Sequence, residues 1–215
     1  MQSKYKLLIL DYGGVYSFPY TLKNFNKIML KAFGRVPNEE ERLKITEQSH
    51  LFGEDKITTE EYVKRLGVIL KVADLPGVEQ FENATIEVTN PPTPEMVELV
   101  SIVRKAGMKV SLLSDMYMFE VELTKPWGRY EDFDYVSFSA EAGMTKRNPR
   151  FFEKTLGHFR VLPQDALFVD DVIKNVEVAK KVGLSTLFAD KEEYEDVKKL
   201  VEAIYQRLGI EQIFR

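Results

Sequence analysis

The sequence contains no cysteine and only two histidines, His50 and His158, among its 215 residues. Without cysteine it has no disulfide framework, no thiolate metal site and no thiol nucleophile. Two histidines also argue against a multi-histidine metal centre or a Ser-His-Asp triad. His50 ends a charged helical stretch and His158 lies near the end of another helical pattern, so we expect His50 on the solvated surface and His158 beside a helix C-terminus.

The sequence also lacks long hydrophobic runs and a strong excess of either charge. Its net charge is −4, from 30 basic and 34 acidic residues spread along the chain, which argues against nucleic acid or an anionic membrane as the main partner. The apolar run 7–10 is too short for a membrane span or the core of a signal peptide. With 44% hydrophobic residues, we expect a cytoplasmic globular protein of one large domain, or of one domain with an insert.

Short apolar runs that suit buried strands recur along the chain. They occupy residues 7–10, 110–113, 135–138, 166–169 and 185–188. Runs without polar alternation are typical of parallel strands that are covered on both faces. Helical stripes separate the later runs. This alternation predicts an α/β fold with a doubly wound, Rossmann-like parallel sheet.

A long segment without a convincing strand, residues 17–92, separates the first two predicted strands. Apolar stripes at 22–33 and 62–70 predict helices there. A crossover between parallel strands needs only a dozen or so residues with one helix. We therefore expect residues 17–92 to form an inserted helical subdomain, while 1–16 and 93–215 form the core. A proline-rich linker returns the chain to that core.

Polar residues stand where the predicted strands and one polar loop meet the expected crevice at the carboxyl edge of the sheet. The candidates are Asp11, Ser114, Asp115, Lys146, Asp170 and Asp171. Clustered carboxylates repel one another unless a hard cation neutralises them, and an oxygen-rich site favours Mg²⁺. A carboxylate such as Asp11 can attack phosphorus when a metal ion and a lysine neutralise the phosphoryl oxygens. The sequence thus indicates chemistry on a phosphate group.

Four motifs in this order resemble those of the haloacid dehalogenase-like hydrolase superfamily. They are LLILDYGGV at 7–15, VSLLSD at 110–115, SAEAGMTKRNPRFFEKTL at 139–156 and ALFVDDVIKNVEVAKKVGL at 166–184. The position of the insert resembles that of members with a small helical cap after the first motif. Within the superfamily, the chain is similar to sugar-1-phosphate phosphatases and to the N-terminal phosphatase domains of epoxide hydrolases.

The resemblance implies a role for each candidate residue. Asp11 would be the nucleophile, Ser114 and Lys146 would bind the phosphate and take part in catalysis, and Asp115 would help to bind the substrate. The implied ligands of Mg²⁺ are Asp11, the backbone carbonyl of Gly13, Asp170 and Asp171. The implied activity is that of a Mg²⁺-dependent phosphatase, which hydrolyses a small organic phosphate through an aspartyl-phosphate intermediate.

The first motif departs from the usual phosphatase pattern at Gly13. Related phosphatases usually carry a second aspartate there, which protonates the leaving group and then activates water. Such acid–base catalysis contributes roughly 10²–10⁴ in rate. We therefore expect a preference for anomeric, aryl or acyl phosphates, whose leaving groups need less help from an acid. Tyr12 and Asp115 are the candidates for a replacement acid.

Two other functions remain open. Gly13 also suits a catalytically impaired protein with a binding or regulatory role. A 2-haloacid dehalogenase would resemble the chain in cap size, but it needs no metal and has other residues where Asp170 and Asp171 stand. A response-regulator receiver domain is set aside, because its acidic pair lies on the first strand.

Overall fold

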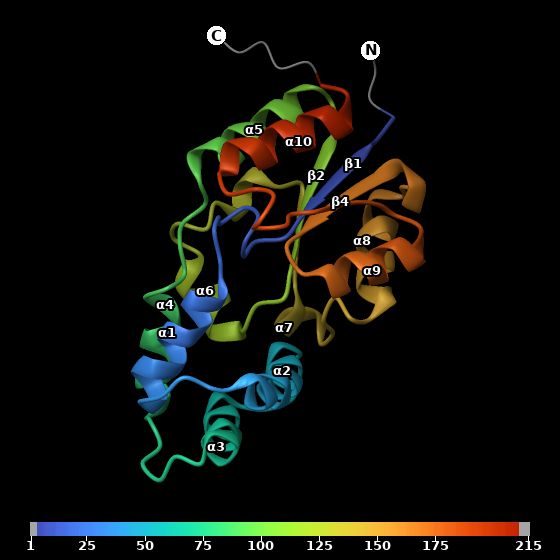
Figure 1. Cartoon of the computed structure of the whole chain (residues 1–215). Coiled ribbons are helices and arrows are strands. Elements are labelled where there is room, and N and C mark those ends of the chain that lie inside the picture. The colour runs from blue at the N-terminus through green and yellow to red at the C-terminus, as the bar shows by residue number, and fades with distance from the viewer. Residues whose placement is uncertain (1–3, 211–215) are drawn as a thin grey trace.

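The computed structural model describes residues 4–210 of the chain. Figure 1 shows a sheet flanked by helices in the upper part of the molecule and helices α1 to α4 in the lower part. Within residues 4–210, no helix is both long enough and apolar enough to cross a membrane.

The sheet has five parallel strands in the order β3-β2-β1-β4-β5. The strands are β1 (Leu7–Leu10), β2 (Lys109–Ser114), β3 (Tyr135–Phe138), β4 (Ala166–Asp170) and β5 (Ser185–Phe188). The central strand β1 pairs with β2 on one side and β4 on the other, and every residue of β1 and β4 is buried. This burial explains their continuous apolar sequence. The predicted doubly wound α/β fold is confirmed.

The two faces of the sheet belong to different hydrophobic clusters. Leu8 and Leu10 of β1 pack with α5 (Pro94–Lys105) and α10 (Val197–Leu208), whereas Leu7 and Ile9 pack with α8 (Pro149–Phe159) and α9 (Ile173–Val182). Side chains alternate between the two faces because a strand has a period of two residues. The remaining elements of this part are α6 (Met118–Thr124), η1 (Tyr130–Asp132), α7 (Ser139–Ala142) and η2 (Pro163–Asp165).

Between β1 and α5 the chain forms α1 (Leu22–Phe33), α2 (Glu39–Gly53), α3 (Thr59–Leu70) and α4 (Val78–Ile86). These helices share their own hydrophobic cluster, in which α1 packs on α4 and α2 on α3. Phe52 of α2 also stacks on Tyr117, just before α6, with 4.3 Å between ring centroids. The two connections to the sheet run together: Ser17 donates a hydrogen bond to the carbonyl of Asn90, at 2.6 Å.

Candidate active site

Asp11 lies directly after β1, where its backbone N–H donates to the carbonyl of Val169 at 3.0 Å. Three groups converge on its Oδ1: the backbone N–H of Tyr12 at 2.7 Å, the Ser114 hydroxyl at 2.7 Å and the Lys146 ammonium at 2.8 Å. No residue that the structure describes donates a hydrogen bond to Oδ2. One oxygen is therefore fixed in place, while the other is available to a ligand.

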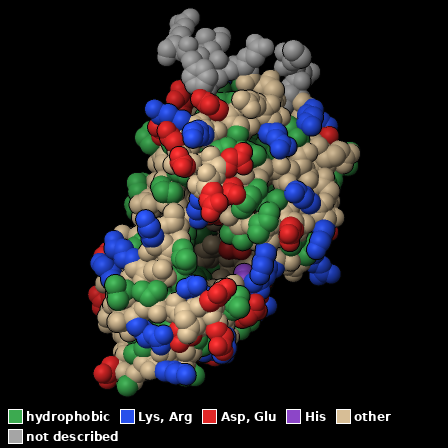
Figure 2. All heavy atoms as spheres, viewed as in Figure 1, with side chains coloured by type: hydrophobic (Ala, Val, Ile, Leu, Met, Phe, Trp, Pro, Cys, Tyr) green, Lys and Arg blue, Asp and Glu red, His purple; other side chains and the backbone are tan. Residues whose placement is uncertain are grey.

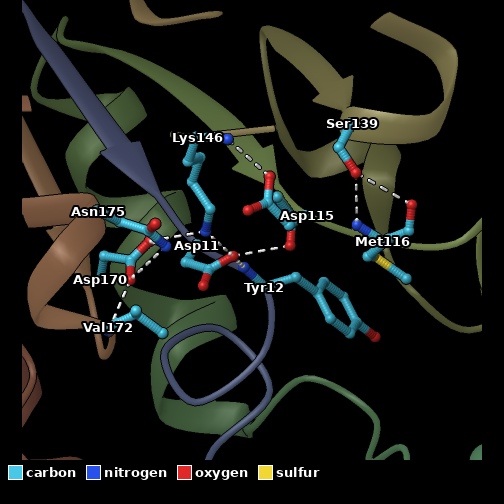
Figure 3. Close-up of polar contacts among 10 residues, drawn as sticks. Asp11, Tyr12, Asp115, Met116, Ser139, Lys146, Asp170, Val172 and Asn175 are labelled. Atoms are coloured by element: carbon cyan, nitrogen blue, oxygen red, sulfur yellow. Dashed lines mark hydrogen bonds and ion pairs between the residues drawn. The ribbon is translucent and has the colours of Figure 1, made fainter. Parts of the chain in front are cut away.

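The Lys146 side chain is 1% exposed, and its Nζ lies 2.8 Å from Asp11 and 2.6 Å from Asp170. Figure 3 shows the three side chains pointing toward one another. Burial on its own would lower the pKa of Lys146, but the charges of Asp11, Asp170 and Asp115 outweigh it and hold this pKa above its ordinary value. The site therefore contains a permanent, buried ammonium group.

Asp170, the last residue of β4, is fully buried and surrounded by donors. Besides Lys146, it accepts hydrogen bonds from the backbone N–H of Val172 at 2.7 Å and from the Asn175 amide at 3.2 Å. Burial raises the pKa of Asp170, and the Lys146 ammonium opposes that rise. Because Asn175 and Val172 both donate to the carboxylate, Asp170 is well placed to hold the lysine in position (Figure 3).

Asp171 lies against the loop that follows β1. It pairs with the Lys191 ammonium at 2.7 Å, and burial followed by the charge of Asp11 raises its pKa. Gly14 has a φ of 77°, and a Cβ atom there would collide with the Asp171 carboxylate. A side chain at position 14 would thus meet both backbone strain and a steric clash.

Asp11, Asp170 and Asp171 each place one carboxylate oxygen within 4.8 Å of the others. The cluster offers only oxygen ligands, and the charge of Asp11 adds to burial in raising the pKa of both Asp170 and Asp171. Both properties fit a hard divalent cation such as Mg²⁺. The carbonyl of Gly13 as a further ligand stays a prediction.

The loop that carries Lys146 is held from several directions. Asp115 accepts a hydrogen bond from the Lys146 backbone N–H at 3.0 Å. Glu54, at the end of α2, accepts from the backbone N–H of Thr145 at 3.3 Å and from its hydroxyl at 3.2 Å. Burial raises the pKa of Asp115 to about 6. Asp115 therefore lies beside the loop that carries Lys146 and lines the cavity. Glu54 connects the same loop to the inserted helices.

Tyr12 does not fit the role of a replacement acid. Its ring is 2% exposed and packs edge-on against Tyr16 and Tyr130, with centroid distances of 6.1 and 5.8 Å. In Figure 3 its side chain leads away from Asp11. Its hydroxyl lies in the hydrophobic core and has no hydrogen-bond partner in the described part of the chain. The hypothesis that Tyr12 replaces the missing acid is therefore wrong.

A cavity of about 670 Å³ lies between the strand ends and the inserted helices. Figure 2 shows it as a hollow where the upper and lower parts of the molecule meet. One face of α2 lines it with Arg42, Thr46, Ser49, His50 and Gly53. The expectation for His50 is thus wrong: it is half-buried and faces the cavity, and burial lowers its pKa. A larger cavity of about 790 Å³ lies beside α5 and contains none of the predicted site residues.

Glu120 also lines the cavity, although it belongs to none of the four sequence motifs. Its carboxylate accepts a hydrogen bond from the backbone N–H of Tyr117 at 3.0 Å, and burial raises its pKa to about 7. The spacing of three residues between Tyr117 and Glu120 is that of a helix N-terminal cap, and this was the only sequence signal for it.

The parallel sheet, the aspartate after its central strand and the carboxylate cluster at the same edge define an α/β protein with an acidic candidate site at the carboxyl edge of its sheet. The family model described as haloacid dehalogenase-like hydrolase matches residues 9–183. The chain belongs to this family, and the predicted resemblance is confirmed.

Relatives are similar to the chain at moderate identity. Acyl-CoA dehydrogenase family member 10 of Mus musculus is 28% identical over 146 residues, which is 66% of this chain but only 14% of the mouse protein. D-ribitol-5-phosphate phosphatase of Bacteroides thetaiotaomicron is 26% identical over 200 residues, covering 84% of this chain and 90% of that enzyme.

A solved structure shows the same fold. It is that of a HAD family enzyme from Bacteroides thetaiotaomicron, in complex with magnesium and inorganic phosphate. The two structures superpose with a TM-score of 0.68 at 22% sequence identity. The matched region covers 86% of this chain and 93% of the Bacteroides chain.

Proposed function

We propose that this protein is a Mg²⁺-dependent phosphatase that hydrolyses a small organic phosphate through an aspartyl-phosphate intermediate on Asp11. The observation that carries the proposal is the state of this carboxylate. Three donors fix its Oδ1, no described residue donates to its Oδ2, and a buried ammonium lies 2.8 Å away. The Bacteroides D-ribitol-5-phosphate phosphatase supports the reaction class, and the complex with magnesium and phosphate supports the cofactor.

In this proposal Asp11 attacks phosphorus with Oδ2 as the bond between phosphorus and the ester oxygen breaks. The ester oxygen leaves as an alkoxide or aryloxide and takes its proton from water, because position 13 carries no acid. Lys146 and Ser114 move part of their hydrogen bonding from Asp11 to the phosphoryl oxygens and stabilise the negative charge that develops there. Water then hydrolyses the acyl phosphate. Asp11, Asp170, Asp171 and the Gly13 carbonyl would hold Mg²⁺, which supplies further neutralisation of the phosphoryl group.

The inserted helices would act as the cap of this enzyme. They form one side of the cavity, and residues of the core line the other side. Closing such a cap excludes water and selects the substrate. We propose residues 17–92 as the cap, and 1–16 with 93–215 as the core; residues 1–3 and 211–215 lie outside the described part.

The test is phosphate release from aryl, anomeric and primary alkyl phosphates by wild type, Asp11→Asn and the exposed control Asp74→Asn, with Mg²⁺ or with EDTA. We expect metal-dependent turnover that Asp74→Asn retains and Asp11→Asn loses by at least about 10³-fold. Aryl and anomeric esters should react faster than alkyl esters because position 13 carries no acid.

Other outcomes would lead to a different function. Turnover that survives in Asp11→Asn would overturn the role of Asp11. Folded, Mg²⁺-binding protein with no activity on any ester would favour a binding or regulatory role. Metal-independent release of chloride from 2-chloropropionate would indicate a dehalogenase.

A further inference from the structure

The wall of the cavity formed by α2 and two core loops carries basic side chains from both parts of the chain. Arg42 and His50 come from α2, Arg147 follows Lys146 in its loop, and Lys174 lies in the first turn of α9 beside Asn175. All four line the same cavity as Asp11. The cap and the core therefore contribute to one basic surface.

These basic side chains have fewer or weaker ion pairs with carboxylates than the two lysines beside the acidic cluster. Lys146 is neutralised by Asp11 and Asp170, and Lys191 by Asp171. Lys174 is exposed and forms no ion pair within residues 4–210. Arg147 pairs with Glu47 at 3.1 Å, but the Glu47 side chain is 66% exposed, and such a pair is weak. The basic surface thus retains positive charge that the protein itself does not neutralise.

The basic residues lie close enough to act together. Burial lowers the pKa of His50, and the charges of Arg147 and Lys174 lower it further, against the opposing charges of Glu47 and Glu54. Arg147 and Lys174 are also chain neighbours of Lys146 and Asn175, which contact Asp11 and Asp170 respectively. The basic surface therefore includes the residues next in the chain to two groups of the candidate site, and it lines the same cavity as Asp11.

We propose that Arg147 and Lys174, with Arg42 and His50 of α2, bind a second anionic group of the substrate. The inference rests on the proposed phosphatase function and specifies its substrate class: a short molecule that carries a carboxylate or another phosphate besides the phosphoryl group transferred to Asp11. A cavity of about 670 Å³ accommodates such a molecule. Because the subsite includes residues of both parts, the second anion also draws α2 toward the core.

Matched esters test the subsite through turnover. 2-Phosphoglycolate is compared with 2-hydroxyethyl phosphate, and 3-phosphoglycerate with glycerol 3-phosphate, since the members of each pair differ in a carboxylate. We expect kcat/KM to be at least about tenfold higher for the anionic member. Lys174→Ala and Arg147→Gln should each reduce this preference mainly through KM, whereas Lys180→Ala, an exposed change on the same helix, should leave it intact.

Equilibrium binding separates failure of the subsite from failure of the proposed function. Calorimetry with Mg²⁺ compares 3-phosphonopropionate with propylphosphonate, neither of which can be hydrolysed. Tighter binding of 3-phosphonopropionate that is lost in Lys174→Ala supports the subsite, whether or not any ester is hydrolysed. Absence of turnover on every ester would overturn the proposed phosphatase function but not the subsite. Equal binding and equal turnover of the paired ligands would overturn the subsite and leave the phosphatase standing.

Discussion

Two adjacent glycines after Asp11 experience opposite surroundings. A Cβ atom on Gly14 would collide with Asp171 at a φ that disfavours side chains, whereas a Cβ atom on Gly13 would meet no atom within 4 Å. Position 13 therefore has room for a Cβ atom, whereas position 14 does not.

Gly13→Asp should consequently raise the hydrolysis of primary alkyl phosphates. We expect kcat/KM for alkyl esters to rise by roughly 10- to 100-fold relative to aryl esters, because a general acid helps poor leaving groups most. Steady-state kinetics on the two ester classes measure this ratio. Gly13→Asn is the control for size without acidity, and an equal effect of both variants would contradict the prediction.

Asp115 should make stability depend on pH. Its pKa is raised from 3.8 to about 6 in the folded state, so between these values the folded protein holds a proton that the unfolded chain has released. Unfolding then releases a proton, and the free energy of unfolding falls as pH rises through this window. Asp115→Asn, which retains an oxygen to accept from Lys146, should lose that slope and gain up to about 3 kcal/mol at pH 7.

Denaturant titrations of wild type and Asp115→Asn at pH 4 to 7, in EDTA, measure the difference. Taking the difference cancels the contributions of the other buried acids. Parallel stability curves for the two proteins would contradict the assignment of the raised pKa to Asp115.

At this scale the sequence predicted which residues come together at the sheet edge, while their roles stay predictions. Asp11, Ser114, Lys146 and Asp170 contact one another because each stands at a strand end or in a loop of the same sheet edge. Glu54 and Glu120 could not be predicted in this way. Their positions depend on how α2 and α6 pack, and no local pattern of charge or spacing specifies that.

Among the elements, α2 has a direct connection to the loop that carries Lys146. Glu54 at its end binds Thr145, and Glu47, two turns earlier, pairs with Arg147. The two contacts flank Lys146 on both sides. The position of α2 is therefore coupled to the position of the ammonium that faces Asp11.

Glu54→Ala should lower kcat by about tenfold with a smaller change in KM, since small displacements of a catalytic group are costly. Glu54→Gln should retain most of the activity because its amide oxygen still accepts from Thr145. Kinetics on an aryl phosphate provide the comparison. If the two variants are equally impaired, the hydrogen bonds to Thr145 do not position the loop.

The strands were predictable from their apolar runs, which match β1, β3 and β5 in full. Such runs are expected for β1 and β4, which are buried throughout, whereas the edge strands β3 and β5 are only partly buried. The apolar stripe at 22–33 likewise matches α1. Helix α2 shows why some elements escape such reasoning. It buries only Ile45, Phe52 and Gly53 and turns a polar face to the cavity, so its sequence reads as a solvated helix.

For the whole molecule, the separation of the helical insert's hydrophobic cluster from the two clusters of the sheet leads to a prediction about unfolding. Helices α1–α4 share one cluster, and the sheet with its helices forms the others. Hydrogen exchange should show α1–α4 opening as one unit, with lower protection than β1 and β4, because local units open below the global free energy of unfolding. Equal protection in both parts would contradict two units.

The fold class followed from strand–helix alternation, but the shape of the cavity did not. The cavity depends on the orientation of the inserted helices over the strand ends, which is fixed by contacts such as that of Phe52 with Tyr117. These aromatic residues lie far apart in the sequence, and each reads there only as a core residue.

The open space beside Gly13 also has a genetic consequence. A change in the second base of any glycine codon to adenine produces a codon for aspartate or glutamate. The first atom of such a side chain meets no described neighbour at this position. An acid at position 13 is therefore a single-base change away, and a population under selection for alkyl phosphate hydrolysis is expected to acquire it early and repeatedly.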